Sequence, residues 1–272
     1  MQLNNKVVVI TGAAGGIGSA MAQRFAKEGA KLVLTDLESS GVKEVAEDLN
    51  GIGLICDVTK EDDIRDVVQK AEETFGPVDM FVSNAGVAFG EGDDAASASN
   101  SVWQTSWEVN VMSHVYAARA VLPSMIERGE GYFLNMASAA GLLSQIGDAA
   151  YSTTKHAAIG FAESLSITHG KQGIKVSCIC PQYVATAMTG YGDGNIENRN
   201  PGIITPDEAA EEILKGIEAE IFIIHTHPEV KLFVQRKSED YDRWLGGMRK
   251  LREQMIEAVG STKLEDMQKF MR

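Results

Sequence analysis

Short apolar runs alternate with longer segments of helical periodicity along most of the chain, and this alternation constrains the fold more than any other feature. The apolar runs predict strands at 7–11, 31–35, 53–56, 80–83, 131–136, 175–179 and 222–225. The segments between them predict helices at 17–28, 38–49, 64–75, 103–126 and 151–169. Strands that are apolar throughout are buried on both faces, and intervening helices provide the crossovers that parallel pairing requires. The pattern predicts a doubly wound α/β fold, with a parallel sheet of about seven strands flanked by helices.

The domain organisation follows from the absence of any proline- or serine-rich linker, composition shift or repeat in the sequence, so we expect one domain over 1–272. The glycine-rich segment 188–205 is long for a connection in a compact domain, which is typical of a substrate-binding loop. The segment 238–272 predicts a C-terminal helical extension. Its apolar residues share one stripe and are expected to pack on the body of the protein or on another subunit: Tyr241, Trp244, Leu245, Met248, Leu251 and Met255.

Composition excludes several function classes. The formal net charge of −13 disfavours nucleic acid and anionic membrane surfaces as partners. No stretch approaches the roughly 18 consecutive apolar residues of a membrane span, and no signal peptide precedes the first strand, so a cytoplasmic location is expected. Three cysteines do not form a disulfide framework, and no spacing predicts a metal site; His225 and His227 lack an evident third ligand.

A glycine-rich turn, Thr11 to Gly18, lies between the first predicted strand and the first predicted helix. Glycines in this position let the backbone approach a pyrophosphate, and the helix N-terminus offers free N–H groups to it. Asp36 ends the second strand, where its carboxylate can accept both ribose hydroxyls of an adenosine. Because a carboxylate repels a 2′-phosphate and no arginine or lysine lies nearby, we expect NAD rather than NADP in a Rossmann-like nucleotide site.

Tyr151 and Lys155 are four residues apart on a predicted helix and therefore share one face. A lysine ammonium beside a phenol is expected to lower the phenol pKa and make it a general acid/base. Ser138, just past the fifth strand, can hold the same substrate oxygen. Asn110 lies in an apolar helix face, so its amide needs a buried partner, either water or backbone near Lys155.

In their order and spacing, these motifs resemble those of the short-chain dehydrogenase/reductase family, in its compact single-domain branch. The resemblance extends over nearly the whole chain to about residue 205. The residues that carry it are Thr11, Gly12, Gly16, Ile17, Gly18, Asp57, Val58, Asn84, Ala85, Gly86, Asn110, Ser138, Tyr151, Lys155, Pro181 and Thr186. Ser83, Ala137 and Gln182 depart from the family pattern, and only Gln182 is expected to alter the pocket near the nicotinamide.

The resemblance implies a role for each matching residue. Tyr151 would be the general acid/base, Lys155 would bind the nicotinamide ribose, Ser138 would orient the substrate oxygen, and Asn110 would hold a water behind Lys155. The family's NAD-binding positions are Gly12, Gly16, Ile17, Gly18, Asp36, Asp57, Val58, Asn84, Ala85, Gly86, Tyr151, Lys155, Pro181, Val184 and Thr186. The implied activity is hydride transfer between NAD(H) and a secondary alcohol or ketone, by a homotetramer or homodimer.

Substrate contacts are predicted from position relative to these residues: Ser144, Gln145, Gln182, Met188 and Tyr191. Apolar neighbours such as Leu142 and Leu143 favour a hydrophobic alcohol or ketone. Two alternatives stay open, an NADP-linked ketone reductase and a non-catalytic dinucleotide-binding protein on the same fold.

Overall fold

The computed structural model describes residues 1–37, 41–91, 94–191, 200, 202–263 and 266. Within them, seven parallel strands form one sheet in the order β3-β2-β1-β4-β5-β6-β7. The strands are β1 (Val7–Thr11), β2 (Lys31–Asp36), β3 (Ile52–Ile55), β4 (Met80–Ser83), β5 (Gly131–Met136), β6 (Ile174–Ile179) and β7 (Ile223–Ile224). The predicted doubly wound α/β sheet is therefore confirmed, although the predicted strand 222–225 shortens to two residues.

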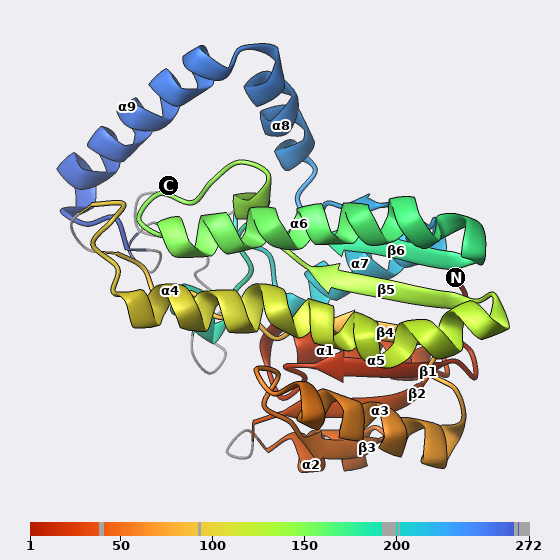
Figure 1. Ribbon diagram of the computed structural model, residues 1–272. Coiled ribbons are helices and arrows are strands. Elements are labelled where there is room, and N and C mark those ends of the chain that lie inside the picture. The colour runs from red at the N-terminus through yellow and green to blue at the C-terminus, as the bar shows by residue number, and fades with distance from the viewer. Residues whose placement is uncertain (38–40, 92–93, 192–199, 201, 264–265, 267–272) are drawn as a thin grey trace.

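Helices cover both faces of the sheet (Figure 1). The helices are α1 (Gly16–Lys27), α2 (Val42–Asp48), α3 (Glu61–Phe75), α4 (Asn100–Trp107), α5 (Ser113–Arg128), α6 (Ala149–His169), α7 (Pro206–Glu218), α8 (Glu229–Glu239) and α9 (Tyr241–Val259). Helices α3, α5 and α6 pack on one face, and α1 and α7 pack on the other.

Strand β1 shows why the sequence gives this layering. Val7 and Val9 belong to the core beneath α3, α5 and α6, whereas Val8 and Ile10 belong to the core beneath α1 and α7. Successive side chains of a strand point to opposite faces, so an apolar run fits only a sheet that is covered on both sides.

The long helix predicted over 103–126 is interrupted. Residues Glu108–Met112 form a π-helical turn between α4 and α5. Asn110 lies in this turn and is fully buried. Single π-turns within helices are frequent at functional sites.

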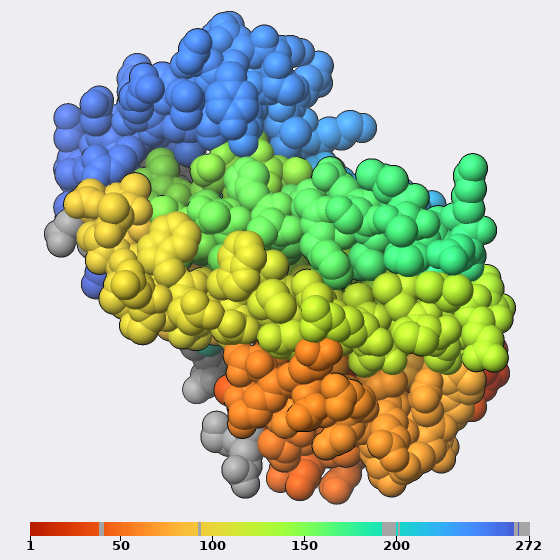
Figure 2. All heavy atoms as spheres, in the orientation of Figure 1, coloured from red at the N-terminus to blue at the C-terminus, as the bar shows by residue number. Residues whose placement is uncertain are grey.

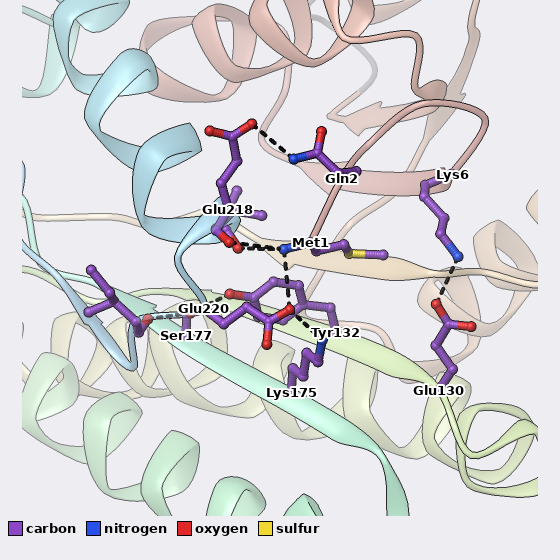
Figure 3. Close-up of polar contacts among 11 residues, drawn as sticks. Met1, Gln2, Lys6, Glu130, Tyr132, Lys175, Ser177, Glu218 and Glu220 are labelled. Carbon is purple, nitrogen blue, oxygen red and sulfur yellow. Dashed lines mark hydrogen bonds and ion pairs between the residues drawn. The ribbon is translucent and has the colours of Figure 1, made fainter.

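The amino ends of β5 and β6 are joined to α7 and the start of the chain by polar contacts (Figure 3). The Lys175 ammonium pairs with Glu220, which also pairs with the amino group of Met1 at 3.3 Å. Behind them the buried Tyr132 hydroxyl lies 2.7 Å from Ser177 Oγ. The polar contacts at this end of the sheet join secondary-structure elements to one another.

Helices α8 and α9 form an arch beyond α6 (Figure 1). Met255 of α9 is fully buried in a third core cluster with Ile146, Tyr183 and Ile203. Tyr241, at the start of α9, is 56% exposed. The predicted apolar stripe of the tail thus packs on the body only toward its C-terminal end. No described helix is both long and apolar enough to cross a membrane.

Candidate active site

A cavity of about 460 Å³ opens at the carboxyl ends of the strands, around the point between β1 and β4 where the strand order reverses. Open α/β sheets bind ligands at such a switch point. Every residue predicted to contact the cofactor lines this cavity: Gly12, Gly16, Ile17, Gly18, Asp36, Asp57, Val58, Asn84, Ala85, Gly86, Tyr151, Lys155, Pro181, Val184 and Thr186.

The glycine-rich turn between β1 and α1 forms one end of the cavity. Helix α1 has Gly15 at its N-cap, and because glycine has no side chain, no N-cap side chain accepts from the first N–H groups of the helix. A Cβ at Gly15 would meet nothing within 4 Å, whereas one at Gly18 would lie 2.1 Å from the carbonyl oxygen of Gly12. The turn is therefore closely packed inside and open toward the cavity, which fits a phosphate at the helix N-terminus.

Asn84 fastens this turn to the end of β4. Its Nδ2 donates to the carbonyl oxygens of Thr11 and Gly12, at 2.9 and 3.0 Å. The backbone N–H of Asn84 donates to the hydroxyl of Thr11 at 3.0 Å. Asn84 thus has a structural role, because its hydrogen bonds fix the shape of the glycine-rich turn.

Asp36 stands beside the turn at the end of β2. Its carboxylate accepts from the N–H of Ala14 at 2.9 Å and from the N–H of Leu37 at 2.8 Å. Among the described residues that line the cavity, Lys155 is the only cation. The cavity wall near Asp36 therefore presents a carboxylate that can accept from ribose hydroxyls. Among the described residues it presents no cation that could pair with a 2′-phosphate on that ribose.

Ser138, Tyr151 and Lys155 gather at the other end of the cavity. Ser138 begins the 3₁₀ turn that follows β5, and its hydroxyl accepts from the N–H of Ala140 at 3.1 Å. Asp148 caps α6 by accepting from the N–H of Tyr151 at 2.9 Å, so the helix begins just before the tyrosine. One turn later, Lys155 Nζ lies 5.6 Å from the centroid of the Tyr151 ring.

Burial controls the ionisation of this pair. It raises the pKa of Tyr151 to about 12, opposed in part by the hydrogen bond with Ser138. It lowers the pKa of Lys155 to about 8. The expectation that Lys155 lowers the tyrosine pKa is wrong for this structure, because the ammonium donates to the carbonyl oxygen of Met136 at 2.9 Å and burial of the phenol dominates.

Asn110 does not line the cavity but lies behind it. Its Oδ1 accepts from the N–H of Val87 and its Nδ2 donates to the carbonyl oxygen of Val87, both at 2.9 Å. Nδ2 also donates to the hydroxyl of Thr154, the neighbour of Lys155, at 3.1 Å. The buried partners of this amide are the backbone of Val87, in the segment that follows β4, and the side chain of Thr154 on α6.

The predicted substrate contacts fall in three places. Gln182 and Met188 line the cavity with Ser138 and Tyr151. Ser144 and Gln145 line a second cavity, which Gln182 also borders. Tyr191 packs against the third core cluster instead. Of the predicted substrate loop, 192–199 and 201 lie outside the described residues.

The cavity lining also includes residues that the sequence motifs do not predict. They are neighbours of predicted positions and have no chemistry that marks them: Gly15, Leu37, Cys56, Val87, Val109, Met136, Ala137, Ala187 and Thr189. Adjacency to the motifs was the only available signal. Burial raises the pKa of the Cys56 thiol to about 11, so this cysteine is an apolar wall element rather than a nucleophile.

In the described part of the chain, no three His, Cys, Asp or Glu side chains gather where they could hold a metal ion. The two histidines after β7 have different surroundings. His227 Nδ1 accepts from the N–H of Gln182 at 3.2 Å, while the buried His225 Nδ1 has no hydrogen-bond partner among the described residues.

Known proteins share these features. Residues 6–194 match the family model described as short chain dehydrogenase. The chain is 32% identical to the mitochondrial borneol dehydrogenase of Lavandula x intermedia over 216 residues, 78% of this chain and 83% of the relative. It is also 32% identical to estradiol 17-beta-dehydrogenase 11 of Mus musculus over 235 residues, 84% of this chain and 77% of the relative.

A solved structure supports the same assignment. A short chain dehydrogenase/reductase from Burkholderia phymatum, in complex with NAD, superposes with a TM-score of 0.79 at 28% identity, over 89% of this chain and 96% of that one. A second structure, from Novosphingobium aromaticivorans, shares the fold at a TM-score of 0.76 and 22% identity, over 96% and 99% of the two chains. With its switch-point cavity, its glycine turn and its serine, tyrosine and lysine, the chain belongs to the short-chain dehydrogenase/reductase family of oxidoreductases.

Proposed function

We propose that this protein is an NAD(H)-dependent oxidoreductase that transfers a hydride between the nicotinamide and a secondary alcohol or ketone. One observation carries the proposal. A single cavity has a phosphate-compatible glycine turn and Asp36 at one end, and Ser138, Tyr151 and Lys155 at the other. A dinucleotide seated along it would bring its nicotinamide toward the hydroxyl-bearing end.

In the direction of ketone reduction, Ser138 donates a hydrogen bond to the carbonyl oxygen and Tyr151 gives that oxygen its proton. A Tyr151 pKa of about 12 keeps the phenol protonated, as a general acid requires. When bound, NAD(H) would supply or take up the hydride, and the positive charge of its oxidised ring would favour the ionised Tyr151 phenol that accepts a proton in alcohol oxidation. Lys155 would hold the nicotinamide ribose.

Two features favour NAD over NADP. Asp36 is fixed by Ala14 and Leu37 where it can accept from ribose hydroxyls, and a 2′-phosphate there would meet its negative charge. The related Burkholderia phymatum structure was solved with NAD. An NADP-linked reductase is the alternative.

The substrate class we propose is an apolar alcohol. Two relatives are named for borneol and estradiol, both largely hydrocarbon alcohols. Met188 and Val109, apolar residues of the cavity wall, agree with such a substrate.

The test is Tyr151→Phe, which removes one hydroxyl and keeps the ring. We expect kcat for secondary alcohols with NAD to fall by about 10²-fold or more, with NADH affinity close to that of the wild type, because the proton-transfer group is lost. Tyr116→Phe is the matched control. Tyr116 lies on α5 outside the cavity lining, and its hydroxyl is 3.5 Å from a Glu108 carboxylate oxygen.

Retained turnover in Tyr151→Phe would contradict the proposed proton transfer. A folded wild type that binds NADH and turns over no secondary alcohol or ketone would instead favour the non-catalytic alternative.

A further inference from the structure

A second cavity, of about 1010 Å³, lies under the arch of α8 and α9. Its floor is the loop that follows Ser138, at 143–146, together with Gln182 and Tyr183. Its roof is formed by α8 and α9, drawn in blue in Figures 1 and 2. The volume is at the upper end of what small-molecule sites enclose, roughly 300–1,000 Å³.

Gln182 joins the two cavities, since it lines both of them. It directly follows Pro181, whose carbonyl oxygen is 3.4 Å from Ser138 Oγ. A molecule held at Ser138 and Tyr151 and extending past Gln182 would therefore enter the second cavity. The loop on its floor contains Ser144, a non-glycine residue held at φ 116°. Backbone strain of this kind persists only where the surroundings enforce it, and it concentrates at binding sites.

The lining of the second cavity has two chemical parts. Much of it is apolar: Leu143, Ile146, Phe233, Trp244, Met248 and Leu251. The other part is a cationic group, here called the arginine rim, formed by the exposed side chains of Arg236, Arg243 and Lys250.

None of the three cations of the arginine rim makes an ion pair with another described residue. The two acids of the lining have other partners. Glu239 accepts from Gln235 Nε2 at 2.9 Å, and Asp240 caps α9 by accepting from the N–H of Arg243 at 2.9 Å. Three cations against two carboxylates leave the lining with a net positive charge in a chain of net charge −13, which favours an anion at this mouth.

The roof is anchored at two places, beside the corner between α8 and α9 and in the C-terminal half of α9. Lys237 of α8 is 8% exposed, and its Nζ donates to the carbonyl oxygen of Leu142 at 2.7 Å. The same ammonium lies 4.7 Å from the ring centroid of Trp244 and 5.3 Å from that of Tyr241. At the far end Met255 is buried in the third core cluster. The cavity therefore has a defined shape and is fastened to the loop that carries Ser138.

Resting on the proposed function, we infer that the second cavity receives the far end of the substrate, and that this substrate is an elongated apolar secondary alcohol or ketone ending in an acidic group. The reacting carbon lies at Ser138 and Tyr151, the apolar body passes Gln182, and the anion meets the arginine rim.

The test compares a homologous series of long-chain secondary alcohols in two forms, one with a terminal methyl and one with a terminal carboxylate. The variant Arg236→Ala/Arg243→Ala should raise the KM of the carboxylate form by about tenfold more than that of the methyl form, as expected for two exposed ionic contacts. The matched control is Arg249→Ala/Arg252→Ala, which removes the same charge from α9 outside the cavity lining. Equal changes for both forms, or equal changes in both variants, would overturn the inference.

Calorimetric binding of a long-chain carboxylate without a hydroxyl separates this inference from the proposed function. Binding that weakens in Arg236→Ala/Arg243→Ala but not in the control supports the cavity assignment even if no alcohol turns over. No binding to the wild type overturns it. Dissociation of an oligomer by the cavity variant alone, measured by sedimentation, would also overturn it, by showing that a second copy of the chain occupies the cavity.

Discussion

Lys155 exposes 1% of its surface, and its Nζ donates to the carbonyl oxygen of Met136. Beside it Tyr151 keeps its proton because burial disfavours the phenolate. In the proposed reaction Lys155 binds the nicotinamide ribose and Tyr151 protonates the substrate oxygen at the same end of the cavity. The ionisation of both side chains is therefore part of the proposed function. It is also measurable in the stability of the protein.

Lys155 makes stability depend on pH in a defined direction. Its folded pKa of about 8 lies below the ordinary value of 10.5, so the unfolded chain binds more protons between these values and stability rises with pH there. We expect the wild type to gain stability relative to Lys155→Met as pH increases from about 8 to 10. Above pH 10 the raised Tyr151 pKa acts in the opposite direction, because the folded state then holds the extra proton.

Urea unfolding at a series of pH values measures this difference, with the exposed Lys171→Met as the matched control. A constant difference between wild type and Lys155→Met across that range would contradict the lowered pKa of the buried lysine.

At the scale of elements, the turn from β1 to α1 depends on β4 through Asn84. Asn84→Ala removes both hydrogen bonds from Nδ2 and leaves the carbonyl oxygens of Thr11 and Gly12 without their donor. We expect a loss of about 1–3 kcal/mol in unfolding free energy and weaker NADH binding, because the turn no longer has a fixed shape. The same substitution at the exposed Asn100 is the control. Wild-type stability and NADH affinity in Asn84→Ala would show that the turn keeps its shape without the Asn84 hydrogen bonds.

A comparison of the predicted and observed elements shows which features can be predicted from the sequence and which cannot. The seven strands and the positions that line the first cavity follow from hydrophobic periodicity and motif order, which are local, whereas helix α7 was not predicted. The break in the helix predicted over 103–126 depends on Asn110 bonding to Val87 across 23 positions, which periodicity does not reveal. The separation of Ser144 and Gln145 from Met188 depends in the same way on how the loop after β5 meets α9.

At the scale of the whole molecule, α9 forms part of the roof over the Rossmann body, and its one fully buried described side chain is that of Met255. Met255→Ala leaves a cavity in the third core cluster, and truncating a buried methionine costs about 2–5 kcal/mol. We expect faster amide hydrogen exchange across Tyr241–Val259 with unchanged exchange in the central strands, because the helix opens locally before the sheet does.

The neighbouring Ile256→Ala is the matched control, since Ile256 is 39% exposed and lies outside the cluster. Equal exchange in the two variants would mean that α9 is not held at Met255.

The most direct test of the proposed function is a calorimetric titration of the folded wild type with NADH and with NADPH, repeated on Asp36→Ala. We predict tight binding of NADH, much weaker binding of NADPH, and a smaller difference in Asp36→Ala, because the carboxylate that accepts from the ribose and repels a 2′-phosphate is gone. Preference of the wild type for NADPH, or binding of neither nucleotide, would contradict the proposal.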